Sequence, residues 1–243
     1  MTDPTRFILI GTSHPGNVGS AARAMKVMGF SELVLVAPRW DGVLQHADAR
    51  AMASGATELL EQARIVATLP EALEGVSYLC ATAMTPRDFG PPTHAPRELF
   101  ATLAPTAQRV AFLFGSERFG MSNQDVYRCH ACLSIPTDPA YGSLNLAQAV
   151  QLIAYDWRQA QGGFPVQPRT PDVVPADAAA VQGLLAHWQR TLVEIGFLDP
   201  AAPKKLMPRL NQLLNRVQPT REEVDILRGL ARAVEARGAK GGP

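Results

Sequence analysis

The chain has 243 residues, of which 47% are hydrophobic and 19% are charged, which is an ordinary globular composition. The net charge is +1, so a surface for nucleic acid would have to come from local charge asymmetry. The run Phe7-Ile8-Leu9-Ile10 is too short for a signal core or a membrane span. Three cysteines, an odd number, fit a reducing compartment. We therefore expect a cytoplasmic protein with no membrane partner.

Short apolar runs alternate with amphipathic segments over the first two thirds of the chain. In chain order we predict a strand at 7–11, a helix at 16–28, a strand at 33–36, a helix at 47–54, an edge strand at 63–67, a helix at 69–74, a strand at 76–81, a proline-rich loop at 85–97, a strand at 109–114, a helix at 122–127, a strand at 133–136 and a helix at 146–159. This alternation predicts an α/β fold, in which helices cover both faces of a parallel sheet.

The composition changes after residue 162. Four prolines mark residues 163–175 as a linker, and only helical patterns follow, at 176–194, 204–216 and 220–236. We therefore predict a first domain at 1–162 and a small all-α extension at 176–243. From residue 203 onward, nine lysines and arginines face four acids, a local charge of +5. A solvated helical face and a phosphate-binding surface both fit this charge.

Three short polar motifs stand where a predicted strand ends and a predicted helix begins. They are Ser13-His14-Pro15-Gly16-Asn17 with Arg23, then Phe114-Gly115-Ser116-Glu117-Arg118-Phe119-Gly120, then Ser143-Leu144-Asn145-Leu146. Sites in α/β proteins gather at the carboxyl ends of the strands, so the three motifs predict one composite site.

Each motif taken alone also has a structural interpretation. Asn17 would cap its helix, and Ser143 or Asn145 would cap another. Glu117 would cap a tight turn, and Arg23, which leaves an apolar helix, would form an ion pair. Neither a P-loop nor a dinucleotide fingerprint is present in the sequence.

The segment Cys129-His130-Ala131-Cys132 has the spacing of a zinc or redox motif. A closed zinc site needs four ligands, and only Cys80 and scattered histidines remain to complete one. We therefore predict buried thiols and no metal. We also predict that Trp40, Trp157 and Trp188 are packing residues.

Taken together, the three motifs resemble the SpoU branch of the SPOUT RNA methyltransferases. The similarity runs through residues 12–29, 114–121 and 143–151. The linker and the helical tail with Ile226-Leu227-Arg228-Gly229-Leu230 are most similar to the tRNA ribose 2′-O-methyltransferases of that branch, which act at nucleotide 32 of the anticodon loop. An rRNA 2′-O-methyltransferase of the same branch, and a catalytically silent RNA-binding module, are the alternatives.

The resemblance implies a deep trefoil knot in the C-terminal part of the sheet domain, S-adenosylmethionine (SAM) as cofactor, tRNA as substrate and a homodimer with the active site near the subunit interface. The implied cofactor residues are Thr82, Ala83, Met84, Gly115, Ile135, Gly142, Ser143 and Leu144. The implied catalytic residues are Asn17, Arg23, Glu117 and Asn145, with Ser143 beside them. The candidate RNA-binding residues of the tail are Lys204, Lys205 and Arg209.

The family resemblance also suggests roles for the catalytic residues. Arg23 would hold a phosphate and stabilise the alkoxide that develops on the ribose, because a guanidinium stays protonated and cannot serve as a base. Glu117 would orient Arg23, while Asn17 and Asn145 would fix the loops and the ribose. Two positions depart from the family pattern, since Thr85 and Ser116 replace residues that are often basic.

Overall fold

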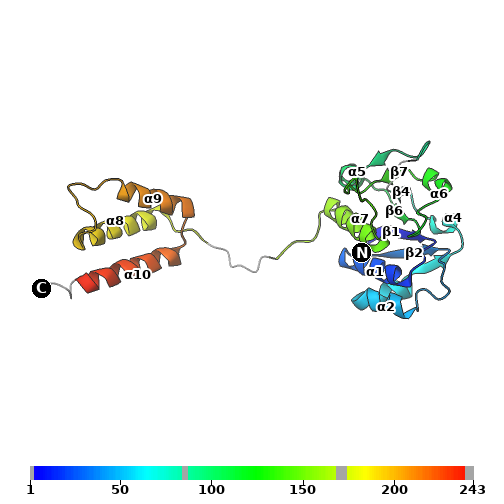
Figure 1. Cartoon of the computed structure of the whole chain (residues 1–243), viewed down its shortest axis with the longest axis horizontal. Coiled ribbons are helices and arrows are strands. Elements are labelled where there is room, and N and C mark those ends of the chain that lie inside the picture. Colours follow the sequence, from blue (N-terminus) through cyan, green and yellow to red (C-terminus); the bar gives the residue numbers. More distant parts are fainter. Residues whose placement is uncertain (1–2, 84–86, 168–173, 239–243) are drawn as a thin grey trace. The chain divides into compact units, whose positions relative to one another are not determined.

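The computed structural model describes residues 3–83, 87–167 and 174–238. The chain divides into two compact units, Met1–Pro165 and Val166–Pro243, which are described separately here (Figure 1). Met84 and Thr85, for which the sequence made predictions, lie outside the described residues. No helix in the described segments is long and apolar enough to cross a membrane.

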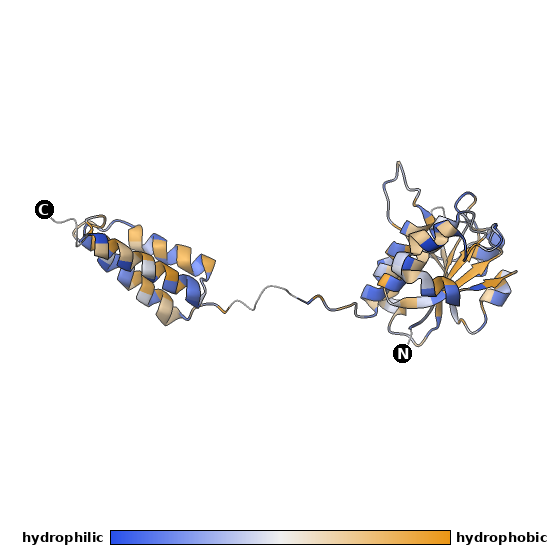
Figure 2. Ribbon diagram, turned by 90° about the horizontal axis from the view of Figure 1, so that it is seen from below, coloured by the Kyte–Doolittle hydropathy of each residue, from blue (hydrophilic) through white to orange (hydrophobic). Residues whose placement is uncertain are grey.

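A seven-stranded parallel sheet forms the centre of the first unit. Its strand order is β3-β2-β1-β6-β4-β7-β5. The strands are β1 (Asp3–Ile10), β2 (Phe30–Val36), β3 (Arg64–Val66), β4 (Tyr78–Thr82), β5 (Thr93–His94), β6 (Val110–Phe114) and β7 (Ala131–Leu133). The central strands are continuous apolar runs, as expected for a sheet that is buried on both faces (Figure 2).

Helices cover both faces of this sheet (Figure 1). The helices are α1 (Pro15–Val27), α2 (Ala47–Ala53), α3 (Thr57–Gln62), α4 (Leu69–Ala72), α5 (Pro96–Leu103), α6 (Asn123–Tyr127) and α7 (Leu146–Ala160), with a short 3₁₀ turn at Ser54–Ala56. Helices α1, α2, α3, α5 and α7 share a core with Phe7 and Leu9. Helices α4 and α6 share the opposite core with Ile8. The predicted parallel α/β fold is confirmed.

Local predictions were wrong at three places. The predicted loop at 85–97 contains β5 and the start of α5, because Pro96 occupies the first helical turn, where a missing N–H costs nothing. The last strand lies at 131–133 rather than 133–136. Helix α3 was not predicted.

The described residues of the second unit form three helices, α8 (Ala178–Glu194), α9 (Leu206–Val217) and α10 (Arg221–Gly238). Their shared core is small and includes Leu184, Leu185, Leu214 and Val224. Polar and apolar residues alternate around these helices, as in amphipathic packing (Figure 2). The predicted all-α extension is confirmed.

Candidate functional site

The three polar motifs meet at the carboxyl end of the sheet, around the loops that follow β1 and β6. Strand β1 pairs directly with β6, and Leu9 lies opposite Phe114. The loops after these strands are therefore neighbours, although about a hundred residues separate them in the chain. The strand order also reverses around this pair, and that is where α/β sheets bind their ligands.

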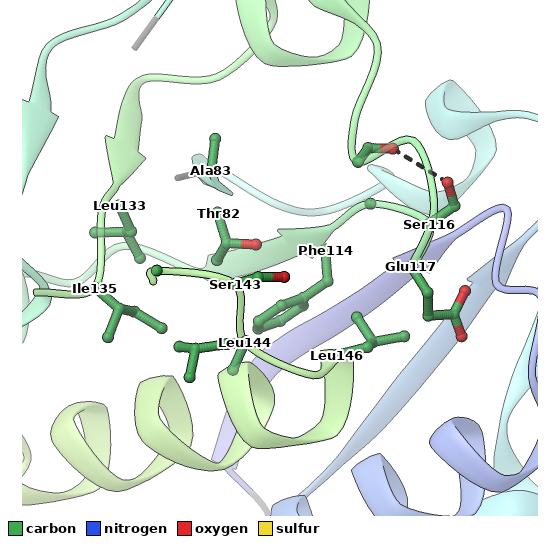
Figure 3. A pocket seen from close by; sticks show the side chains of 14 residues that line it. Thr82, Ala83, Phe114, Ser116, Glu117, Leu133, Ile135, Ser143, Leu144 and Leu146 are labelled. Atoms are coloured by element: carbon green, nitrogen blue, oxygen red, sulfur yellow. Dashed lines mark hydrogen bonds between the residues drawn. The ribbon is translucent and has the colours of Figure 1, made fainter. Parts of the chain in front are cut away.

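A cavity of about 280 Å³ opens beside these loops (Figure 3). Its walls come from the ends of β4, β6 and β7 and from the segment that leads into α7. The lining residues are Thr82, Ala83, Phe114, Gly115, Ser116, Glu117, Gly120, Leu133, Ile135, Gly142, Ser143, Leu144, Leu146 and Ala149. Seven of the eight residues that we predicted for the cofactor are in this set, and the eighth, Met84, is outside the described residues.

Two glycines shape the loop after β6. A Cβ atom on Gly115 would lie 2.1 Å from the carbonyl carbon of Gly120, so no side chain fits there. Gly120 itself has a φ of +66°, a left-handed conformation that favours glycine. The backbone groups of Ser116 and Gly120 hydrogen-bond to each other in both directions, at 3.1 and 2.8 Å. The loop is thus a closed turn that presents Glu117 in a fixed direction (Figure 3).

The carboxylate of Glu117 accepts four hydrogen bonds from the first motif and from Thr12, which precedes it. One oxygen accepts from the Thr12 hydroxyl at 3.0 Å and from the Asn17 amide nitrogen at 2.9 Å. The other accepts from the backbone N–H and the hydroxyl of Ser13, both at 2.8 Å. Glu117 therefore joins the loop after β6 to the loop after β1.

These contacts determine the charge state of Glu117. Burial acts to raise its pKa, but the hydrogen bonds from Asn17 and Ser13 outweigh burial and hold the pKa at about 2, below the ordinary 4.5. Glu117 is therefore ionised at any physiological pH. Because every contacting group donates to it, its role is to position the loop rather than to transfer protons.

Asn17 and Asn145 extend this network. The Asn145 amide nitrogen donates to the Asn17 side-chain oxygen at 3.0 Å. Asn145 also caps α7, since its side-chain oxygen accepts from the Ala147 N–H at 2.9 Å. The prediction that Asn17 caps its helix is wrong, because His14 holds the cap position and the Asn17 side chain turns towards Glu117. Asn145 confirms the corresponding prediction for α7.

Arg23 stands apart from this network. It is exposed on α1 and does not line the cavity. Within the described part of the chain it has no hydrogen bond or ion pair. The predicted structural ion pair of Arg23 is therefore wrong within the described chain, where the contacts of Glu117 are to Thr12, Ser13 and Asn17.

Residue-level reasoning missed the contribution of Thr12 and Ser13. Ser13 begins the first motif and Thr12 directly precedes it, but the prediction singled out Asn17 and Arg23. Thr12 is 1% exposed and directly follows Gly11, a sign that its hydroxyl needs an internal partner. Ser143 lines the cavity, and its hydroxyl forms no hydrogen bond with any described residue.

The cysteines play no part in this site. Cys80, Cys129 and Cys132 are buried and free, which confirms the prediction of buried thiols. Burial raises the pKa of Cys129 to about 12, so this thiol is unreactive at neutral pH. No group of three or more histidine, cysteine or acidic side chains in the described residues could hold a metal ion.

The tryptophans differ from one another. Trp157 is 3% exposed and lies in the main core, and Trp188 packs against the core of the second unit. Trp40 is 48% exposed, so its prediction as a packing residue is wrong.

The three basic residues of the tail lie at the beginning of α9. Lys205 precedes the first helical residue, Lys204 stands before it, and Arg209 is in the first turns. All three are exposed. They are in the second unit, and the cavity is in the first.

Two family models match different parts of the chain. The SpoU rRNA Methylase family matches residues 4–155, which cover the sheet and all three motifs. The chain belongs to the SpoU methylase family. The C-terminal domain of the tRNA methyltransferase TrmJ matches residues 179–242, which cover the three helices of the second unit.

Relatives of this SpoU methylase extend over nearly its full length. A tRNA (cytidine/uridine/adenosine-2′-O-)-methyltransferase TrmJ from Pseudomonas aeruginosa is 43% identical, over 95% of this chain and 93% of the relative. A tRNA (cytidine/uridine-2′-O-)-methyltransferase TrmJ from Pectobacterium atrosepticum is 39% identical, over 97% and 98%. The crystal structure of TrmJ from Z. mobilis ZM4 superposes with a TM-score of 0.80 at 32% identity, over 95% of this chain and 99% of that one. The chain is thus similar to TrmJ proteins in both units.

Proposed function

We propose that this SpoU methylase is a SAM-dependent tRNA ribose 2′-O-methyltransferase that acts at nucleotide 32 of the anticodon loop, on cytidine, uridine or both. The observation that carries the proposal is the combination of the two matches on one chain. The SpoU match is shared with rRNA methyltransferases, whereas the match to the TrmJ C-terminal domain supports tRNA.

The lining of the cavity suits the chemistry of SAM. Its walls combine apolar side chains such as Ile135, Leu144 and Leu146, which suit an adenine ring, with polar groups from Thr82 and Ser143. Because Gly115 has no side chain, its backbone packs closely against Gly120. The loop therefore stays compact beside a ligand in the cavity. We infer that Thr82, Ala83, Met84, Gly115, Ile135, Gly142, Ser143 and Leu144 hold the cofactor.

When bound, SAM would supply an activated methyl group. The residues of the chain would hold the ribose in line with that group, since alignment gives much of the rate. Asn17 and Asn145 hydrogen-bond to each other, and Glu117 fixes Asn17, so these side chains form a rigid wall. We infer that this wall positions the target ribose, with Ser143 beside it.

Arg23 is the candidate for electrostatic catalysis. A guanidinium is a strong donor for phosphate and for a developing alkoxide. Arg23 has no partner among the described residues, so its donors are available to RNA. In one chain Arg23 does not line the cavity, which supports a homodimer whose active site is completed near the subunit interface.

The knot, the domain bounds and the location of the protein are proposed from its family. The knot expected of SPOUT proteins would fold the segments around the cavity, and residues 1–162 would be the methyltransferase domain. Residues 163–175 would link it to the RNA-binding extension at 176–243. We place the enzyme in the cytoplasm, where tRNA is modified.

The cations at the N-terminus of α9 are placed unfavourably for the helix itself. Lys204 and Lys205 directly precede helix α9, which has no acid in its first turn. Cations at a helix N-terminus oppose the helix dipole, so these residues cost helix stability rather than add to it. A phosphate backbone would compensate for this cost. We therefore assign Lys204, Lys205 and Arg209 to tRNA.

The test is methyl transfer from labelled SAM to separate pools of total tRNA and rRNA. We expect label in tRNA and none in rRNA. Label in rRNA alone would favour an rRNA methyltransferase, and binding of tRNA without transfer to either pool would favour the silent RNA-binding module.

A further inference from the structure

A group of exposed cationic and aromatic side chains lies beside the Glu117 network. Phe119 is 64% exposed in the loop after β6. The guanidinium carbons of Arg39 and Arg118 each lie 5.3 Å from the centroid of its ring. Trp40, next to Arg39 in the chain, is 48% exposed. We call these four residues the aromatic ledge.

The aromatic ledge is fixed to the same loop that binds Glu117. The Arg39 backbone N–H donates to the Thr12 carbonyl oxygen at 3.0 Å. The Trp40 indole N–H donates to the Ser13 carbonyl oxygen at 2.8 Å. Phe119 is two residues from Glu117 in the closed turn of β6. The ledge therefore keeps a fixed position relative to Glu117.

Among the described residues, the charges on the ledge have no anionic partner. Neither Arg39 nor Arg118 forms an ion pair or side-chain hydrogen bond with any described residue. Asp125 lines the same hollow as Phe119 and Arg39, but its carboxylate accepts from the Ser122 hydroxyl at 2.7 Å. Two cations on one ring repel each other, so this arrangement does little for folding and leaves the site ready for an anion.

An exposed ring with flanking arginines suits unpaired RNA. Bases in single-stranded loops stack on aromatic side chains and on guanidinium planes, and arginine also binds phosphate. We propose that the aromatic ledge binds a nucleotide next to the methylated one, with Phe119 stacking on its base while Arg39 and Arg118 contact phosphates. This inference rests on the proposed function, since it takes a tRNA loop as the ligand.

The test is the affinity of the full chain for total tRNA, measured at several salt concentrations. Phe119→Ala is expected to weaken binding about tenfold, because loss of one base stack has about that effect. Phe119→Trp keeps a stacking surface and is expected to bind nearly as the wild type does. The affinity for SAM is expected to stay unchanged in both variants.

The arginines are tested through the salt dependence. Arg39→Ala with Arg118→Ala is expected to reduce the slope of log affinity against log salt by roughly one to two, because each phosphate contact contributes somewhat less than one. Arg64→Ala is the matched control, since Arg64 is an exposed cation at the amino end of β3. The control is expected to keep the wild-type slope.

Two results would overturn the inference. One is a Phe119→Ala variant that binds tRNA as tightly as the wild type. The other is a variant that binds tRNA normally but changes the oligomeric state in sedimentation, which would make the ledge a protein contact. Binding of tRNA does not require methyl transfer. If the protein transfers no methyl group but Phe119→Ala still weakens tRNA binding, the proposed function fails and the role of the aromatic ledge stands.

Discussion

Arg6 and Arg23 both emerge from apolar segments of the first unit, but the fold surrounds them differently. Arg6 in β1 is 3% exposed, and its guanidinium donates to the Glu32 carboxylate at 2.8 Å and to the carbonyl oxygens of Ala72 and Glu74 at 2.6 and 2.8 Å. Arg109 adds a second cation to Glu32 at 3.2 Å. Arg23 is exposed and has no such contact among the described residues.

The difference separates an arginine that stabilises the fold from one that we propose acts on the substrate. A buried guanidinium is tolerated only when its charge and its donors are satisfied, and Arg6 meets both conditions. Arg23 needs no internal partner, because water solvates it. Its donors can therefore exchange water for the phosphate of a substrate. The structural ion pair expected from the sequence exists in this unit, but it belongs to Arg6.

The largest effect is expected for Arg23→Ala. Methyl transfer should fall about 10³-fold, the upper range for loss of one electrostatic stabiliser. The affinity for SAM should remain near normal, and the free energy of unfolding should change by less than about 0.5 kcal/mol, as for other exposed positions. Single-turnover transfer and calorimetric SAM binding measure the two quantities. Substantial residual turnover would contradict the role of Arg23.

Arg6→Ala should show the opposite pattern. Without Arg6, the negative charge of Glu32 has only Arg109 as an ion-pair partner among the described residues. The free energy of unfolding should therefore fall by about 3–5 kcal/mol. Denaturant unfolding measures this loss. The fraction that stays folded should still bind SAM, because Arg6 is distant from the cavity residues in the sheet. A stability equal to that of Arg23→Ala would remove the contrast between the two arginines.

Neutralising the start of α9 should have a smaller effect. Replacing Lys204, Lys205 and Arg209 by glutamine should weaken tRNA binding about tenfold or more at moderate salt and flatten its salt dependence. The control is Arg232→Gln, which removes an exposed charge from α10. An unchanged salt slope in the triple variant would make the basic tail a solvated surface.

The smallest effect is confined to acid. The pKa of Glu117 is about 2 in the folded chain and near 4.5 when it is free of contacts. Its contribution to stability is therefore complete above pH 4.5 and is lost as the pH falls towards 2. Glu117→Gln should flatten the decline of unfolding free energy over that range, while Glu61→Gln, on the exposed face of α3, should not. Parallel declines in all three proteins would contradict the ionised state of Glu117.

The sequence predicted most of the sheet, because buried parallel strands are continuous apolar runs and their ends are marked by glycine or proline. Prediction from the sequence failed where the hydrophobic pattern was short or irregular. The two residues of β5 carry no period, and α5 starts at a proline in a proline-rich stretch. Strand β5 forms because β7 pairs with it, and α5 forms because it packs against α7, and local patterns record neither contact.

The site was predicted as a set of residues but not as a network. The three motifs were recognisable in the chain, and seven of the residues predicted for the cofactor line one cavity. Which side chain contacts which depends on the pairing of β1 with β6, a contact between distant segments. For this reason the contacts of Glu117 with Thr12, Ser13 and Asn17 were not predicted, and the exposure of Trp40 was missed.

The most direct test of the account uses two matched synthetic tRNAs that differ only in the 2′ position of nucleotide 32, which is hydroxyl in one and deoxy in the other. With the full-length wild-type protein and labelled SAM, we predict transfer to the first tRNA and none to the second. Equal transfer to both would contradict the assignment of the reaction to the ribose of nucleotide 32.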